Sequence, residues 1–272
     1  MTESAILAGS PLFYALLIVI GLTVGTYGTL VGLGGGIILL PILFALFPGT
    51  PPEMLTGISL AVVLLNALSG TIAYARQGRI DYHSGALFAA ATVPGTVVGV
   101  WLVRFIEIKL FGIIFGTLLL AVAALLLIRP RANNSSITAP GNTEGIRREG
   151  LSRRMRRALG TGLSFVVGFI AGLLGIGGGV IHVPMMLYLL RFPVPIATAT
   201  SHFILIFTAL TGVITHLVLG TEAINWPIVL CLALGIIPGA QLGARLSHKL
   251  RGTLIIRLLA LALVILGIRL IF

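Results

Sequence analysis

A glycine-rich phrase that ends in proline occurs twice in this chain, each time inside a long hydrophobic run. Residues 32–41 read GLGGGIILLP and residues 175–184 read GIGGGVIHVP, with four glycines and the proline in register. Such residues weaken a helix in lipid, where freed backbone groups find no water. Paired interruptions in the two halves of a membrane protein are the best sequence pointer to a transporter's substrate site. The repeat therefore predicts two broken helices that serve a common site.

The composition places the chain in a membrane. Hydrophobic residues make up 57% and charged residues 9% of the 272 positions, whereas a soluble domain carries about 25% charged residues. Several apolar runs reach the roughly 20 residues that a membrane helix needs, and the first and fifth are too long for one span. The runs cover residues 12–42, 58–75, 86–103, 110–128, 161–190, 197–219, 228–246 and 254–272. The sequence predicts an all-α polytopic membrane protein.

The net charge of +11 is concentrated between two hydrophobic halves. Eight arginines lie within residues 129–157, and juxtamembrane arginines set membrane orientation and attract anionic lipids. This placement argues against nucleic acid as a partner. We therefore divide the chain into a first membrane repeat (1–128), an Arg-rich cytoplasmic linker (129–157) that contacts anionic lipids, and a second membrane repeat (158–272).

The two hydrophobic halves align along their length. The segment TGIS at 56–59 corresponds to TATS at 198–201, and VPGTVVG at 93–99 corresponds to IPGAQLG at 237–243. The basic loops at 76–79 and 245–251 both become cytoplasmic when the glycine motif splits each long run into two crossings. This positive-inside argument predicts inverted-topology repeats of about four to five segments each, with both termini outside.

These paired motifs resemble the TauE/SafE sulfite exporter family. The resemblance rests on the two Gly-Gly-Gly-x-x-x-x-Pro motifs, the serine that follows each, the Asp81-Tyr82 and Asn225-Trp226 pairs, and the two Pro-Gly motifs. It covers the whole chain except the linker. It implies a carrier in a bacterial-type inner membrane that moves sulfite, organosulfonates or related small sulfur-containing anions, usually outward.

The predicted membrane spans contain almost no charged side chain, so an anion site must use neutral groups. Backbone N–H groups and helix N-termini beside the glycine triplets can bind an anion without a buried cation. Polar side chains that follow the motifs add hydrogen-bond donors. The candidate substrate-binding residues are Gly34, Gly35, Gly36, Ser59, Asn66, Gly177, Gly178, Gly179, His182, Thr200, Ser201, His202 and Gln241.

Each candidate also has a purely structural reading. The glycines could allow close helix packing, the hydroxyls could bond their own helix backbone, and the histidines could be hydrogen-bonded core residues. Pro94-Gly95 and Pro238-Gly239 could be hinges or simple kinks. His182 and His202 have a reference pKa near 6.5, so either could couple proton movement to anion movement.

Two other classes of function compete with transport. An intramembrane hydrolase would need a base correctly placed beside Ser59 or Ser201, and no nucleophile elbow is present, so we predict that the chain is not an enzyme and name no catalytic residue. A non-transporting scaffold or sensor could act through the Arg-rich linker, but it would not need twin glycine breaks. A carrier for another small organic anion also remains open. We expect no cofactor and no metal, because no ligand set accompanies the histidines.

Overall fold

The computed structural model describes residues 11–128, 153–190, 192–220 and 224–247, together with parts of 260–268. Residues 129–152, which make up most of the predicted linker, lie outside these ranges. The regular elements of the described residues are helices: α2 (Pro11–Val31), α3 (Gly36–Leu46), α4 (Pro52–Arg76), α5 (Tyr82–Val103), α6 (Ile108–Ile128), α7 (Arg153–Leu174), α8 (Gly179–Pro184), the π-helix η1 (Met185–Leu189), α9 (Val194–Val218) and α10 (Trp226–Leu246).

Five of these helices are apolar and long enough to cross a membrane, namely α2, α4, α5, α9 and α10. The buried polar side chains of the described residues are Thr, Ser, Asn and His, with no Asp, Glu, Lys or Arg among them. Both observations agree with an interior that lies within a bilayer. The predicted all-α polytopic membrane fold is confirmed.

The long hydrophobic runs break at the glycine motifs. Helix α2 ends at Val31 and α3 begins at Gly36, while α7 ends at Leu174 and α8 begins at Gly179. Positive φ angles occur at the same three positions of each motif, 87°, 76° and 84° in the first and 65°, 75° and 88° in the second. An L-residue with a side chain adopts this left-handed region only at a cost of roughly 1–2 kcal/mol. The glycines therefore make two turns of the same conformation.

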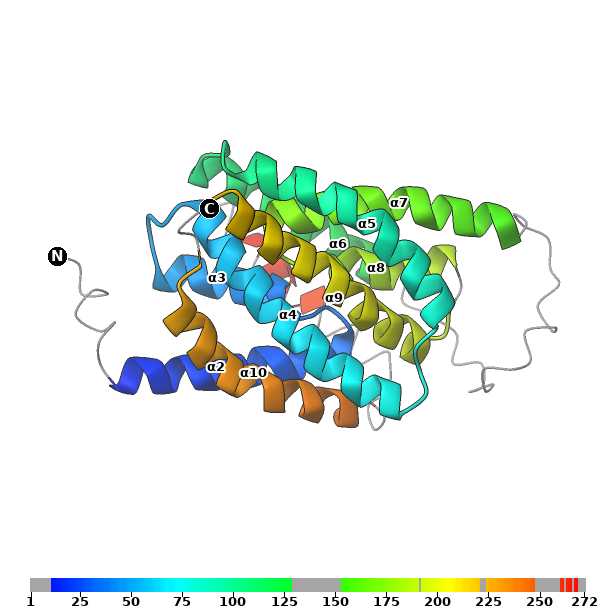
Figure 1. Ribbon diagram of the computed structural model, residues 1–272, viewed down its shortest axis with the longest axis horizontal. Coiled ribbons are helices and arrows are strands. Elements are labelled where there is room, and N and C mark those ends of the chain that lie inside the picture. The colour runs from blue at the N-terminus through cyan, green and yellow to red at the C-terminus, as the bar shows by residue number, and fades with distance from the viewer. Residues whose placement is uncertain are drawn as a thin grey trace.

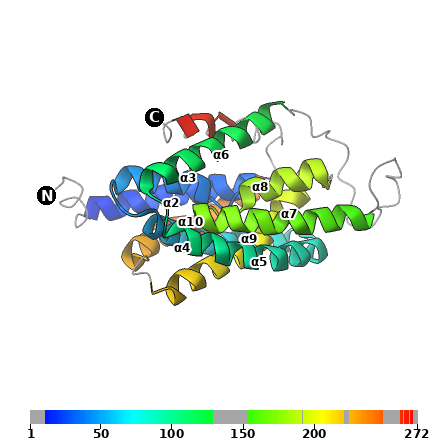
Figure 2. The same ribbon diagram turned by 90° about the horizontal axis from the view of Figure 1, so that it is seen from above.

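Each broken helix forms a hairpin that opens toward one end of the bundle. In Figure 1, α2 enters from the left and α3 returns to the left, whereas α7 enters from the right and α8 returns to the right. Figure 2 shows the same separation of α3 from α8. This opposite sense is what an inverted repeat requires, and the orientation of the repeats in the membrane stays a prediction.

The segment after each motif is too short to cross. Helix α3 has 11 residues, which extend over about 16 Å, against a hydrocarbon thickness of about 30 Å. Positive-inside logic counted this segment as a crossing, whereas its length favours a segment that turns back, and the number of crossings stays a prediction. If both arms of each hairpin enter and leave on the same side of the membrane, each half loses two crossings. Every other loop then keeps the side assigned to it.

Helices pair across the two halves of the chain. Helix α2 packs along α10, α5 packs along α7, and α4 crosses α9 in the centre. Glycines allow the backbones of the outer pairs to touch: a Cβ on Gly95 would clash with the carbonyl oxygen of Phe165, and one on Gly235 with that of Ile18. Pro94 and Pro238 lie inside the continuous helices α5 and α10, which favours kinks over hinges at these positions.

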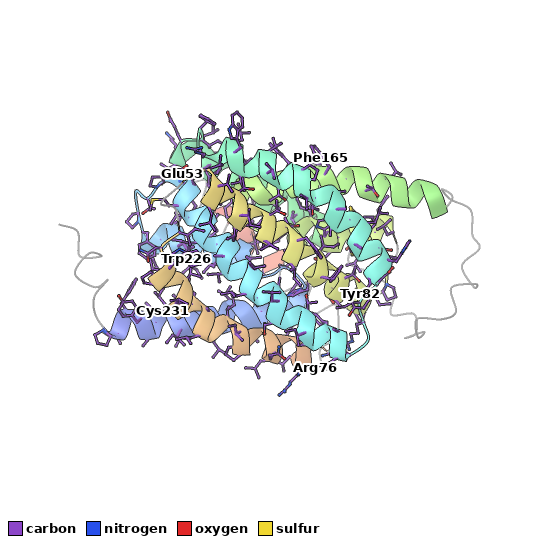
Figure 3. All side chains as sticks on the ribbon, viewed as in Figure 1. Glu53, Arg76, Tyr82, Phe165, Trp226 and Cys231 are labelled. Atoms are coloured by element: carbon purple, nitrogen blue, oxygen red, sulfur yellow. The ribbon has the colours of Figure 1, made fainter. Side chains whose placement is uncertain are left out.

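Charged side chains lie toward the two ends of the bundle. Figure 3 places Glu53 and Trp226 toward one end and Arg76 and Tyr82 toward the other. Arg104 lies at the end that the positive-inside argument predicts to be external, and its Nε lies 3.6 Å from the Glu53 carboxylate. The ion pair neutralises this arginine at an end where positive-inside logic disfavours it.

Candidate functional site

The two glycine turns touch each other where the hairpins meet. A methyl group placed on Gly36 would lie 2.9 Å from the Cα of Ile176, and one placed on Gly179 would lie 2.9 Å from the Cα of Leu33. Gly36 and Gly179 are aligned positions, and so are Leu33 and Ile176. The contact is therefore reciprocal, and any side chain at either glycine would separate the turns.

Helices α3 and α8 both begin at this contact. Their first N–H groups have no partner within their own helix, and the positive end of each helix dipole lies there. Because α3 and α8 run away from the contact toward opposite ends of the bundle (Figures 1 and 2), the two positive ends converge. A converging pair of helix N-termini attracts negative charge without any cationic side chain.

Serine side chains fix each turn to the opposite half of the chain. The hydroxyl of Ser59 donates to the carbonyl oxygen of Gly175 at 2.6 Å, and that of Ser201 donates to the carbonyl oxygen of Gly32 at 3.1 Å. Both serines are fully buried. These bonds reach across the interface, so the alternative that both hydroxyls bond only their own helix is wrong.

One face of α9 contacts the first turn through residues at helical spacing. A methyl group on Gly32 would meet the Cα of Thr198 at 2.8 Å, Ser201 bonds the Gly32 carbonyl, and His202 lies one position further on the same face. The corresponding face of α4 contacts the second turn through Thr56, whose Cα would lie 2.7 Å from a methyl group on Gly175. Each central helix thus supports the other half's turn.

Two apolar side chains fill the space beside the turns. A methyl group on Gly34 would lie 2.9 Å from Leu205 and 3.3 Å from Val63, and one on Gly177 would lie 2.5 Å and 2.8 Å from the same two side chains. Val63 and Leu205 are aligned positions on α4 and α9, and both are fully buried. The centre is therefore closed in this conformation by a matched apolar pair.

A polar cluster on one side of the centre joins three helices. The Thr29 hydroxyl of α2 lies 3.3 Å from His202 Nε2 of α9 and donates to Asn66 Oδ1 of α4 at 3.1 Å. The Tyr74 hydroxyl donates to the Thr29 carbonyl oxygen at 2.6 Å. All four side chains are fully buried, and the Asn66 Nδ2 atom has no hydrogen-bond partner.

The remaining candidates lie elsewhere. The Thr200 hydroxyl accepts from the Asp81 backbone N–H at 3.0 Å, at the start of α5. Gln241 Nε2 donates to the carbonyl oxygen of Ser69 at 2.7 Å and lies 3.0 Å from its hydroxyl, which joins α10 to α4. His182 Nδ1 lies 3.2 Å from the Gly178 carbonyl oxygen within its own hairpin. The structure thus places Ser59, Ser201 and the glycines together and engages Thr200 and Gln241 in helix contacts.

Sequence reasoning missed Thr29, Val63 and Leu205 as parts of this centre. Val63 and Leu205 occupy aligned positions one turn beyond the matched serines, so the repeat itself carried a signal for them. Thr29 has no counterpart in the second half, where the aligned residue is Gly172. Only the packing of α2 against α4 and α9 reveals its role.

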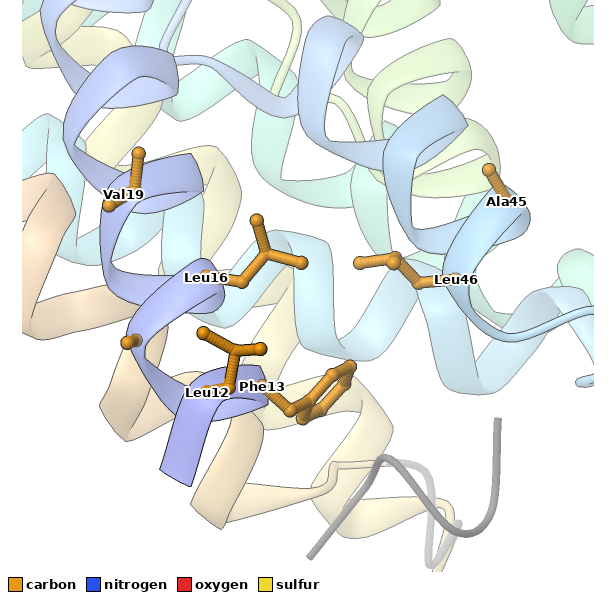
Figure 4. A pocket seen from close by; sticks show the side chains of 7 residues that line it. Leu12, Phe13, Leu16, Val19, Ala45 and Leu46 are labelled. Carbon is orange, nitrogen blue, oxygen red and sulfur yellow. The ribbon is translucent and has the colours of Figure 1, made fainter. Parts of the chain in front are cut away.

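The surface carries an apolar groove away from the turns. A groove of about 650 Å³ lies between the first half of α2 and the end of α3 (Figure 4), and its lining consists of Leu12, Phe13, Ala15, Leu16, Val19, Ala45 and Leu46. It carries no group that could recognise an anion. Among the described residues no cluster of three or more His, Cys, Asp or Glu could hold a metal ion.

The fold and the paired turns define a polytopic α-helical membrane protein of the transporter class, with two glycine hairpins at its centre. The model of the family described as "Sulfite exporter TauE/SafE" matches residues 17–270, and the chain belongs to this family. It is therefore a membrane transporter of the TauE/SafE family, as the sequence resemblance indicated.

Named relatives support the same class. The chain is 32% identical over 268 residues to "Probable membrane transporter protein YunE" of Bacillus subtilis, covering 95% of this chain and 97% of that protein. It is 28% identical over 251 residues to a probable membrane transporter protein of Methanocaldococcus jannaschii, covering 88% of each chain. A Xylella fastidiosa relative with the same kind of name is 31% identical over 223 residues, covering 81% of this chain and 80% of that one. No solved structure matches the chain significantly.

Proposed function

We propose that this transporter exports small sulfur-containing anions, such as sulfite or organosulfonates, through a site where the two glycine turns meet. The observation that carries the proposal is the convergence of the α3 and α8 N-termini at a contact with no buried charged side chain among the described residues. Helix dipoles and backbone N–H groups stabilise an anion there, and a cation is repelled.

The donors of this site are proposed residue by residue. Gly34, Gly35 and Gly36, with Gly177, Gly178 and Gly179, provide backbone that a substrate can approach closely. Ser59 and Ser201 hold the turns in position, and Asn66 and His202 add side-chain donors beside the first turn. Thr200 and Gln241 support the surrounding helices rather than contact the substrate, whereas the buried Nε2 of His182, which has no hydrogen-bond partner, is a further donor beside the second turn.

The matched apolar pair supports alternating access as the mechanism. Val63 and Leu205 close the centre, so a substrate reaches the turns only when the helices that carry them move apart. Since α4 and α9 each support the opposite turn, a rocking motion of one half against the other exposes the site to one side at a time. The predicted inner-membrane location, the cytoplasmic linker at 129–157 and its contact with anionic lipids belong to the same proposal.

The membrane potential supplies the driving force for export. Moving one charge across the membrane is worth about 2.3 kcal/mol per 100 mV, and the cell interior is negative. An exported dianion gains twice this free energy, so the potential favours the export of any anion that crosses with a net negative charge. The absence of buried carboxylates among the described residues agrees with such a mechanism.

The test is direct binding and efflux. Purified protein is titrated with sulfite, thiosulfate, sulfate and small alkylsulfonates, and the same anions are loaded into proteoliposomes with an imposed voltage. We expect selective binding of one sulfur-containing anion and, for the sulfite dianion, efflux that quickens when the interior is negative. No binding of any of these anions would move the substrate outside the sulfur-containing class. Efflux of sulfite that does not respond to the voltage would contradict the membrane potential as its driving force.

A further inference from the structure

The faces of α4 and α9 that support the turns are closely matched between the halves, and one position on them differs in its chemistry. Along the supporting faces of α4 and α9, Thr56 aligns with Thr198, Ser59 with Ser201 and Val63 with Leu205. Within the same face His202 aligns with Leu60, and each of these two side chains packs against an aligned glycine. A methyl group on Gly70 would lie 2.6 Å from the His202 ring, and one on Gly212 would lie 2.6 Å from Leu60. One half therefore carries an imidazole where the other carries an aliphatic side chain.

The histidine is connected to the first turn by a switchable hydrogen bond. Thr29 has a single hydroxyl hydrogen, and its oxygen lies within bonding distance of both Asn66 Oδ1 and His202 Nε2. When Thr29 donates to Asn66, His202 Nε2 must donate to Thr29; an unprotonated Nε2 requires the hydroxyl to turn toward it. The Thr29 carbonyl oxygen accepts from the Gly32 N–H at 3.1 Å, so the residue that bonds His202 is also bonded to the first glycine turn.

No charged side chain lies in contact with the imidazole among the described residues. From α4 it faces Tyr74, whose ring centroid is 5.5 Å away, and from α2 it faces Thr29. The titratable and charged groups of the packed elements lie further off: Asp81 bonds Ser84 at the start of α5, Arg79 donates to Ser247, and His182 lies beside Gly178. Other such groups on these elements are Tyr14, Tyr27, Glu53, Arg76, Tyr82, His83, His216, Cys231 and Arg245.

A buried imidazolium at this position has no carboxylate to balance it, and burying an unpaired charge is strongly unfavourable. A bound anion at the neighbouring turn would supply the missing negative charge. Proton binding and anion binding must then favour each other by the same factor. This reasoning rests on the proposed anion site and adds a requirement to it.

We propose that His202 takes up one proton from water when an anion binds, so that the transporter carries the two together and releases both on the opposite side. Both ring nitrogens carry hydrogen in the bound state, and one donates toward Thr29. A sulfonate monoanion then crosses as a neutral pair, and a sulfite dianion crosses with one net charge instead of two. Anion affinity is highest at low pH and falls about tenfold per pH unit once the free histidine is neutral.

The test uses methanesulfonate and ethanesulfonate, which stay fully ionised over the working pH range, so every proton taken up belongs to the protein. Calorimetric titrations in buffers of different ionisation enthalpy count the protons bound per anion. Repeating them at several pH values gives the slope of the logarithm of anion affinity against pH. We expect about one proton per anion in the natural protein. We expect a slope near zero in His202→Gln and in His202→Leu, which copies the residue aligned at Leu60. The exposed His83→Gln variant keeps the natural slope.

The outcomes separate a failure of the proton coupling from a failure of the anion site. Binding without proton uptake in the natural protein overturns this inference and leaves the anion site standing. A proton slope that survives in His202→Gln but is lost in His182→Gln assigns the proton to His182 and also overturns it. No binding of either sulfonate, together with none of sulfite or thiosulfate, overturns the proposed function and this inference with it.

Discussion

Ser59 and Gly175 are 116 positions apart in the chain, yet the serine hydroxyl donates to the glycine carbonyl oxygen at 2.6 Å. The aligned pair Ser201 and Gly32 makes the same bond at 3.1 Å. Each serine belongs to a helix that supports the other half's turn. Duplication of the sequence thus produces an interface in which each half completes the other, and the proposed site exists only when both halves are folded.

Replacing either serine should weaken this interface. Ser59→Ala or Ser201→Ala leaves a buried carbonyl oxygen without its partner, and we expect a loss of about 1–3 kcal/mol of stability. Unfolding in detergent micelles measures it. Ser164→Ala serves as the control, since that buried hydroxyl bonds Gly160 in its own helix at 2.7 Å and its loss leaves the interface intact. Equal losses of stability in all three variants would show that the two bonds between the halves contribute no more than a bond within one helix.

Replacing Gly177 with alanine should lower the stability of the protein more than the same replacement at a glycine that has a similar φ but no neighbouring atoms. Gly177 has φ 75° and faces Leu205, whereas Gly49 has φ 81° and nothing within 4 Å of an added Cβ. Both substitutions introduce strain of about 1–2 kcal/mol. Only Gly177→Ala also displaces a core side chain, so its melting temperature should fall further. Equal melting temperatures would show that the turn is not tightly packed.

The outer helix pairs should depend on glycine in the same way. A Cβ on Gly95 would clash with the Phe165 carbonyl oxygen, while a Cβ on Gly162 of α7 would meet nothing within 4 Å. Gly95→Ala should therefore force α5 away from α7 and lower the yield of folded protein. Gly162→Ala should be neutral or stabilise by roughly 0.5–1 kcal/mol, because alanine favours helix. Size-exclusion profiles and thermal unfolding distinguish the two.

Gln241 should act with Ser69 as a helix-pairing residue. A double-mutant cycle with Gln241→Leu and Ser69→Ala measures the energy of the bonds between them. Interhelical hydrogen bonds in membranes average about 0.6 kcal/mol in such cycles, and we expect a coupling of that order. Strictly additive effects would indicate that the two residues do not interact, and an unchanged stability with weakened anion binding would return Gln241 to the site.

The orientation of the bundle can be tested with single cysteines. Cys231 is the only cysteine, so Cys231→Ser provides a cysteine-free background. A cysteine at Gly49, close to Glu53, should react with an impermeant reagent added outside cells, and one at Gly78, close to Arg76, should react only after the membrane is opened. The reverse pattern would place the linker outside and contradict the positive-inside assignment.

The sequence predicted the membrane class, the family and the positions of both helix breaks. These features depend on hydrophobicity and on glycine conformation, which are local properties of a chain. The fourteen-residue segment 34–47 was open to several readings, because a stretch of that length can tilt, stop part-way through the bilayer or re-enter. Its direction depends on what it packs against.

The sequence by itself determined that two glycine turns form, since no other residue type adopts three positive φ angles in one turn without strain. Only the tertiary structure decided that the turns touch, that Ser59 and Ser201 bond across the halves, and that Thr200 and Gln241 are engaged in helix contacts. It also decided that Thr29 joins His202 to Asn66, and that Val63 and Leu205 close the centre. These outcomes depend on which helix faces meet. Hydrophobicity does not select a partner helix inside a bilayer, because lipid is as apolar as the helix surface. Close packing and individual hydrogen bonds select it, and both require the folded structure.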